Sequence, residues 1–125
     1  MRSRLTWIGS LVLVFAAGIA VGALQQPATG TRREPQFDNA DLTVWKSIIM
    51  PNQPLAMHRH DFGRAIVALK GGTLDIVDGS GKTVKQMTWE TGKAYWLGVD
   101  PPGEQHGDMN RGKEPIEVMV VQLKK

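Results

Sequence analysis

The chain has 125 residues and a mass of 13.7 kDa, enough for one domain, and its 42% apolar and 22% charged residues are typical of a globular protein. The absence of cysteine excludes disulfides, thiolate metal sites and a cysteine nucleophile. Arg2 and Arg4 account for two of the net positive charges, and the other 13 basic and 12 acidic residues form no basic cluster, which argues against a nucleic-acid partner.

The first feature along the chain is an uncharged apolar segment, LTWIGSLVLVFAAGIAVGAL, at residues 5–24. A helix of this length spans about 30 Å, the thickness of the hydrocarbon core of a membrane. The two arginines before it predict a cytoplasmic N-terminus and transfer of the following residues across the membrane. Residues 1–24 are therefore predicted to be a hydrophobic helix, either a cleaved signal peptide or an uncleaved transmembrane anchor. In both cases we expect the domain to be extracytoplasmic, either free in the periplasm or membrane-anchored and facing it.

Residues 25–36, QQPATGTRREPQ, contain two prolines and no aliphatic cluster. This composition is typical of a linker. The folded domain is therefore placed at residues 37–125.

From residue 37 onward the sequence predicts short strands separated by turns. We expect strands at residues 42–50, 57–70, 73–77, 83–90, 93–97, 104–110 and 116–123. The run Asp78-Gly79-Ser80-Gly81 is a strong hairpin signal. Seven short strands without a helical stripe predict an all-β, antiparallel sandwich or barrel.

Two of these segments, residues 65–69 and 116–123, are apolar on both faces. A barrel strand whose outer face meets water should instead alternate between apolar and polar residues. The second face must then be covered, either by another subunit or by the segment around Trp45. We therefore predict a homodimer.

The three histidines are the strongest chemical signal. His58 and His60 are two residues apart on an expected strand, which places both imidazoles on one face. Such a pair can chelate one metal ion if a third ligand faces it, and His106 lies on a separate expected strand. The same alternation continues to Phe62 and Arg64. Taken alone, the pattern also fits histidines with ordinary core or surface roles.

Two stretches of the domain extend this pattern. The first holds His58, His60, Arg64 and Gly71, and the second holds Pro101, Gly103, His106 and Asn110. In order and spacing they resemble the two conserved motifs of the cupin superfamily. The resemblance implies an antiparallel cupin, or jelly-roll, β-barrel in which His58, His60 and His106 bind one divalent transition metal. Iron, manganese, nickel, copper and zinc all suit such ligands. It also implies turn roles for Gly71 and Gly103 and a structural role for Asn110.

Arg64 departs from the cupin pattern, which has a glutamate ligand at this position. Arginine has no lone pair to donate, and at an effective dielectric near 20 a guanidinium about 6 Å from a divalent ion is repelled by roughly 5 kcal/mol. Several solutions are open. Glu104 or Asp108 could be the fourth ligand, or could pair with Arg64. Alternatively, Arg64 and Phe62 bind an anionic substrate, with or without a metal, or Arg64 pairs with Asp61.

We therefore predict an exported, mononuclear metal-binding cupin. The favoured function is a small metalloenzyme of the oxygenase or isomerase/lyase type, acting on a small oxygen-rich or carboxylate-bearing molecule. The alternative is a non-catalytic cupin module that binds a small anionic ligand or a metal in the cell envelope. No catalytic residue is identified by the sequence.

Overall fold

The computed structural model describes residues 29–125. The predicted hydrophobic helix at residues 1–24 lies outside the described residues. Within residues 29–125, no helix has the length and apolar character needed to cross a membrane.

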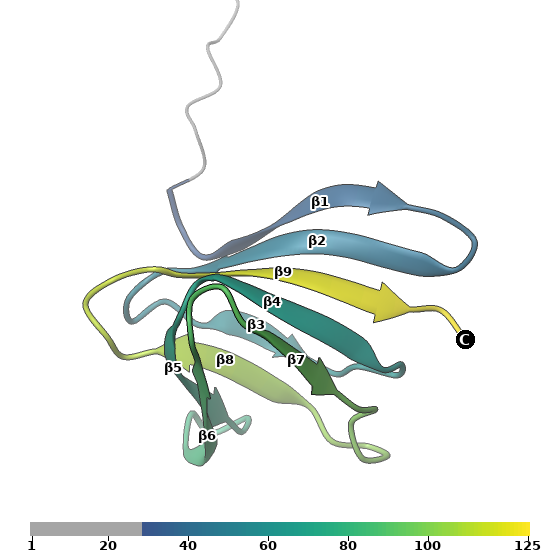
Figure 1. The fold of residues 1–125 in the computed structure, drawn as a ribbon. Helices are drawn as coiled ribbons and strands as arrows, with labels where there is room; N and C mark the ends of the chain where they lie inside the picture. The colour runs from purple at the N-terminus through teal and green to yellow at the C-terminus, as the bar shows by residue number, and fades with distance from the viewer. Residues whose placement is uncertain (1–28) are drawn as a thin grey trace, which may run out of the picture.

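The described residues form two antiparallel β-sheets, which lie as two layers in Figure 1. The nine strands are β1 (Arg32–Asp38), β2 (Leu42–Ile49), β3 (Leu55–His58), β4 (Arg64–Lys70), β5 (Gly72–Val77), β6 (Thr83–Trp89), β7 (Ala94–Leu97), β8 (His106–Asn110) and β9 (Ile116–Leu123). One sheet has the order β1-β2-β9-β4-β7 and the other the order β3-β8-β5-β6. The prediction of an all-β antiparallel fold is confirmed for this part of the chain.

The core lies between the two sheets. Ile49, Leu74, Ile116 and Val118 are at most 2% exposed and belong to one continuous hydrophobic cluster. Burial alternates along β4 and β9, as expected where one face of the sheet packs inward. The inner faces also carry buried polar residues. The apolar core therefore borders directly on a polar site.

The strand predicted over residues 57–70 is wrong as a single element. The structure has β3 and β4 there, separated by residues 59–63. The intervening loop is fixed by distant segments: the His60 amide donates to the Asp100 carboxylate (2.6 Å), and the Leu123 amide donates to the Gly63 carbonyl (3.0 Å). These tertiary contacts override the local preference for a continuous strand.

The predicted linker at residues 25–36 extends too far, because residues 32–36 form most of β1. This strand lies at the edge of its sheet and pairs only with β2, with a register shift between Pro35 and Phe37. An edge strand tolerates proline at a bulge. Since its side chains are mostly exposed, the strand lacks the apolar alternation by which strands are recognised.

Two residues of the cupin-like motifs have the structural roles expected of them. The Asn110 side chain, 1% exposed, donates to the carbonyls of Ile49 (2.9 Å) and Glu114 (2.7 Å) and ties β8 to neighbouring segments. At Gly71, a Cβ atom would lie 2.1 Å from the Trp89 carbonyl oxygen. The backbones approach so closely there that only glycine fits.

Candidate metal centre

The three histidines converge inside the fold. His58 ends β3 and His106 begins β8, and the two are directly paired across these strands. His60 follows in the loop after β3. One ring nitrogen from each residue lies within 4.8 Å of the others, and the ring centroids are 4.5–5.7 Å apart. The prediction that these three residues come together is confirmed, and the cluster is compatible with a metal ion.

An oxygen atom lies beside Nδ1 of each ring. The contacts are His58 Nδ1 to the Ala56 carbonyl (2.7 Å), His60 Nδ1 to Oε1 of Gln122 (2.9 Å) and His106 Nδ1 to Oδ2 of Asp100 (3.5 Å). An acceptor at Nδ1 keeps the ring proton there and leaves the lone pair on Nε2. Metal-binding histidines in proteins are oriented in this way by contacts of their other nitrogen.

Asp108 is the carboxylate nearest to the free nitrogens. Its two oxygens lie 3.7 Å from Nε2 of His58 and 3.7 Å from Nε2 of His106, and its side chain is 13% exposed. His58 Nε2 is buried and has no hydrogen-bond partner among the described residues. The lone pair on His58 Nε2 and the Asp108 carboxylate therefore face each other with no hydrogen-bond donor between them. A bound cation would satisfy both, so these residues fit a divalent metal.

Burial sets the protonation of these groups. It lowers the pKa of His58 and lowers the pKa of His60 to about 4. Both rings are therefore neutral near pH 7, which is the form that donates a lone pair. Burial also raises the pKa of Asp108, and a nearby divalent charge would lower it.

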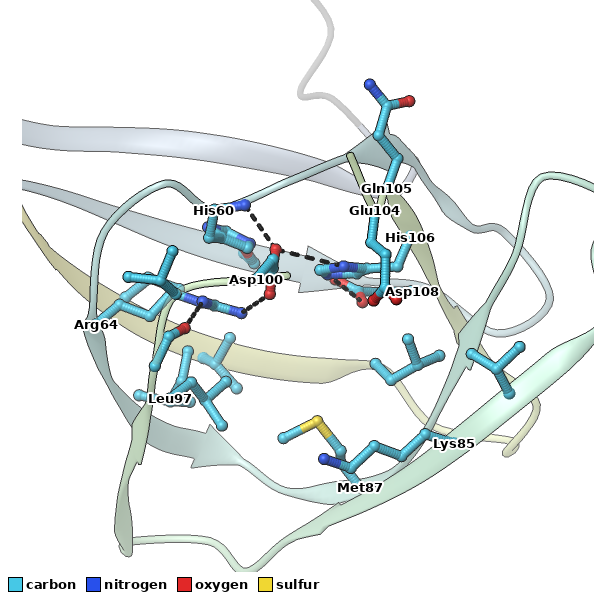
Figure 2. Close-up of a pocket in the computed structure, with 18 of the residues that line it drawn as sticks. His60, Arg64, Lys85, Met87, Leu97, Asp100, Glu104, Gln105, His106 and Asp108 are labelled. Carbon is cyan, nitrogen blue, oxygen red and sulfur yellow. Dashed lines mark hydrogen bonds and ion pairs between the residues drawn. The ribbon is translucent and has the colours of Figure 1, made fainter. Parts of the chain in front are cut away.

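Asp100 is the site residue that the sequence did not indicate. Its carboxylate accepts from the His60 amide (2.6 Å) and lies 3.5 Å from Nδ1 of His106 and 3.9 Å from Nη2 of Arg64. Figure 2 shows it in the centre of the group, between these three residues. Asp100 lies in a loop, where strand periodicity gives no information about side-chain direction. Its position before the proline of the second motif is the one signal that could have drawn attention to it.

Arg64 is buried at the start of β4, where it also donates to the Gly98 carbonyl (3.0 Å). The alternative in which it pairs with Asp61 is wrong, because Asp61 pairs with Arg59 (2.6 Å). The acidic partner of Arg64 is instead Asp100.

Phe62 and Glu104 are the two remaining candidates. Phe62, predicted to face the site, is 38% exposed and is not among the residues that line the cavity, because the loop at residues 59–63 breaks the expected alternation. Glu104, the other candidate fourth ligand, lies exposed in the loop before β8. It lines the cavity but makes no ion pair with a histidine among the described residues.

A cavity of about 790 Å³ opens onto the site, a size suited to a small molecule. Apolar side chains of both sheets, including Trp45 and Trp89, form part of its wall. The charged residues lining it are Arg33, Arg64, Lys85, Asp78, Asp100, Glu104 and Asp108. Arg33 and Lys85 were not expected there from the sequence.

Comparison with known proteins identifies the fold. No model of a protein family and no curated protein matches the chain. Solved structures do match: a cupin domain from Bordetella pertussis, with a TM-score of 0.65 and 20% identity, covers 77% of this chain and 95% of its own. A protein with a double-stranded β-helix domain from Klebsiella pneumoniae has a TM-score of 0.56 and 24% identity over 78% of this chain and 81% of its own. A cupin family protein from Methanocaldococcus jannaschii has a TM-score of 0.57 and 10% identity over 79% of this chain and 84% of its own.

At these identities the similarity establishes the fold. The described part of the chain has the cupin, or double-stranded β-helix, fold, in agreement with the resemblance carried by its two motifs.

Proposed function

We propose that this cupin domain binds a single divalent transition metal and acts as a small metalloenzyme on a small carboxylate-bearing or otherwise oxygen-rich molecule. The observation that carries the proposal is the unpartnered Nε2 of His58 facing the Asp108 carboxylate, with two further imidazoles beside them. His58, His60 and His106 would hold the ion. Asp108 would supply the carboxylate that the cupin motif otherwise has at the position of Arg64.

When bound, such an ion supplies Lewis-acid polarisation of a substrate oxygen or, for a redox-active metal, electron transfer. The chain's own residues prepare the site in other ways. Arg64 has five donors, of which one donates to the Gly98 carbonyl, so others remain available to a substrate carboxylate. Trp45 and Trp89 provide apolar walls that limit the access of water to the bound molecule.

Elemental analysis of the purified protein, produced in metal-replete medium, tests the metal site. We expect about one equivalent of one divalent metal per chain, and its loss in His60→Ala and His106→Ala. The matched control is Asp61→Asn, which removes a carboxylate held by Arg59 outside the cluster and should leave the metal content unchanged. Metal-free wild-type protein, or undiminished metal in both histidine variants, contradicts the proposal.

A second function is a non-catalytic module that binds a small anion or the metal itself. It is favoured by the state of the two carboxylates next to the histidines. Asp100 lies against Arg64 and His106, and Asp108 would bind the metal, so neither carboxylate would be left to act as a general base. The two functions differ in turnover: metal-loaded protein that binds small carboxylates but converts none of them supports the binding module.

We also propose that the domain works outside the cytoplasm. The support is in the sequence, where two arginines precede the uncharged segment at residues 5–24. Cell fractionation, together with the intact mass of the isolated protein, distinguishes a cleaved periplasmic form from a membrane-anchored one. Recovery of the full-length chain in the cytoplasm contradicts both.

Finally, we propose that two copies pair through the outer face of the larger sheet. Ala65 and Val67 on β4, and Met119 and Val121 on β9, are neighbours on this face and only partly buried, and Trp96 beside them on β7 is 62% exposed. An apolar surface of this kind marks a protein interface. Sedimentation of protein lacking residues 1–24 tests this, and a monomer mass at every concentration contradicts it.

A further inference from the structure

Arg33 is an unexpected cation at the cavity. It lies on β1, and its guanidinium carbon is 5.1 Å from the centroid of the Trp45 ring. Trp45 in turn stacks parallel to His60, with centroids 6.4 Å apart. Arg33, on the edge strand β1, therefore contacts an aromatic ring that also stacks against a histidine of the metal centre.

Arg33 has no anionic partner among residues 29–125, in contrast to its neighbour Arg32. Arg32 lies on the opposite side of the strand and pairs with Glu34 at 2.8 Å. Arg33 and Arg64 both line the cavity, and for both guanidinium groups burial lowers the pKa while Asp108 opposes the shift. Arg33 is an exposed residue of β1. Since arginine stays protonated, a guanidinium that borders the cavity without a carboxylate partner is suited to receive an anion.

The charges next to the histidines indicate how many negative charges that anion carries. Arg33, Arg64 and a divalent ion supply four positive charges, and Asp100 and Asp108 supply two negative charges. Two positive charges remain without a counterpart.

Three further charged residues line the cavity and are not counted in this balance. Lys85 and Glu104 are exposed and of opposite sign. The Asp78 carboxylate keeps its negative charge, but it accepts the backbone amides of Ser80 and Lys82 and is held in the hairpin turn.

We propose that the molecule bound in this cavity is a small dicarboxylate, with one carboxylate held by Arg33 and the other by Arg64 at the metal centre. The proposal rests on the metal site proposed above. Arg33 and Arg64 come from strands that are separated in the sheet by β2 and β9, which is about 14 Å across the strands at the usual strand spacing. The pairing register places Arg33 level with Ala68, so the two arginines are also offset along the strand direction. Two separated carboxylates suit this arrangement better than one compact dianion such as phosphate. Arg33 is then a substrate-binding residue that selects dicarboxylates over monocarboxylates.

Calorimetric titration of the metal-loaded full-length chain in detergent tests the proposal. The probes are malonate, succinate and glutarate as dicarboxylates, butyrate as a monocarboxylate, and inorganic phosphate. At least one dicarboxylate should bind about 10-fold or more tighter than butyrate. Arg33→Gln should weaken that dicarboxylate by about 10- to 100-fold and leave butyrate nearly unchanged, as expected for loss of a charge-assisted contact.

Arg32→Gln is the matched control, because it removes the same charge from the other side of the same strand. It should change no affinity. Arg33→Lys keeps the charge without the bidentate geometry and should give an intermediate loss. If thermal melts show that Arg33→Gln does not fold, Arg33→Lys carries the comparison.

The outcomes separate this inference from the proposed function. Protein without metal by elemental analysis overturns both. Metal-loaded protein overturns only the dicarboxylate inference if butyrate or phosphate binds as tightly as every dicarboxylate. The same holds if the Arg33 variants bind like wild type or like Arg32→Gln.

Discussion

Asp108→Asn is expected to stabilise the metal-free protein and to weaken its affinity for a divalent ion. His58 Nδ1 donates to the Ala56 carbonyl, so the unpartnered Nε2 presents a lone pair. The Asp108 carboxylate lies 3.7 Å away and presents only acceptors when ionised. An asparagine amide in the same place can donate to Nε2. Above the raised pKa of Asp108, where its carboxylate is ionised, the substitution therefore replaces an acceptor facing an acceptor with a hydrogen bond.

Both effects are large enough to measure. One new buried hydrogen bond contributes about 1 kcal/mol, which raises the melting temperature of a domain of about 100 residues by roughly 4–8 °C. The loss of metal affinity has the opposite sign. Removing an outer partner of a metal-bound histidine costs about 10- to 100-fold, and removing a carboxylate that binds the ion directly should cost at least the upper value, about 2.7 kcal/mol.

Circular dichroism melts of metal-free protein and competition with a chromophoric chelator measure the two quantities separately. Asp61→Asn is the control for charge removal at an exposed position and should change both quantities little. The reasoning is refuted if metal-free Asp108→Asn melts below wild type, or if it binds the ion as tightly as wild type does.

Three further substitutions test the fold around the site. Asn110→Ala leaves buried backbone groups unpaired and should lower the free energy of unfolding, measured in urea titrations, by about 3 kcal/mol. A loss below about 1 kcal/mol contradicts the role of Asn110 in linking β8 to its neighbours. Gly71→Ala places a Cβ 2.1 Å from a backbone carbonyl oxygen and should lower the melting temperature strongly. Gly79→Ala, which has open space around it, should not. Equal effects of the two substitutions contradict the close backbone approach at Gly71. The pKa of Asp75 is held below its unfolded value by hydrogen bonds, of which the one from Gln86 has the largest effect. Asp75 therefore stabilises the fold at pH values above its unfolded pKa. This stabilisation is lost as the pH falls through the folded pKa. Asp75→Asn should therefore melt below wild type at pH 7, with the difference closing below about pH 4, and a difference that is constant with pH contradicts this assignment.

The parts of the fold that the sequence predicted well are those with a strong local signal. The strand expected at residues 116–123 is β9 without a change of boundary, because a long apolar run ends in turns on one side and in lysines on the other. The pairing of His58 with His106 was also accessible, since the order of the two motifs predicts that they meet.

The missed features depend on contacts between distant segments. Nothing near β1 distinguishes an exposed edge strand from a linker, so Arg33 was not considered for the site. The loop at residues 59–63 is held by Asp100, whose carboxylate accepts from the His60 amide and whose own amide donates to the His60 carbonyl. In this loop Phe62 is turned to the surface while His60 stays at the site. Strand alternation describes side-chain direction only where the backbone stays extended.

The replacement of the usual glutamate by Arg64 is best understood together with two aspartates. Asp108 lies two residues after His106 on β8 and so reaches the histidines from the strand that already carries one of them. Asp100 lies 3.9 Å from the Arg64 guanidinium, where the attraction is about 4 kcal/mol at an effective dielectric of 20. A glutamate at position 64 would turn this attraction into a repulsion of the same order and would add a third carboxylate to the site. Arg64 and Asp100 therefore form one unit, and Arg64→Glu by itself would not recreate the usual cupin ligand set unless the charge of Asp100 were removed with it.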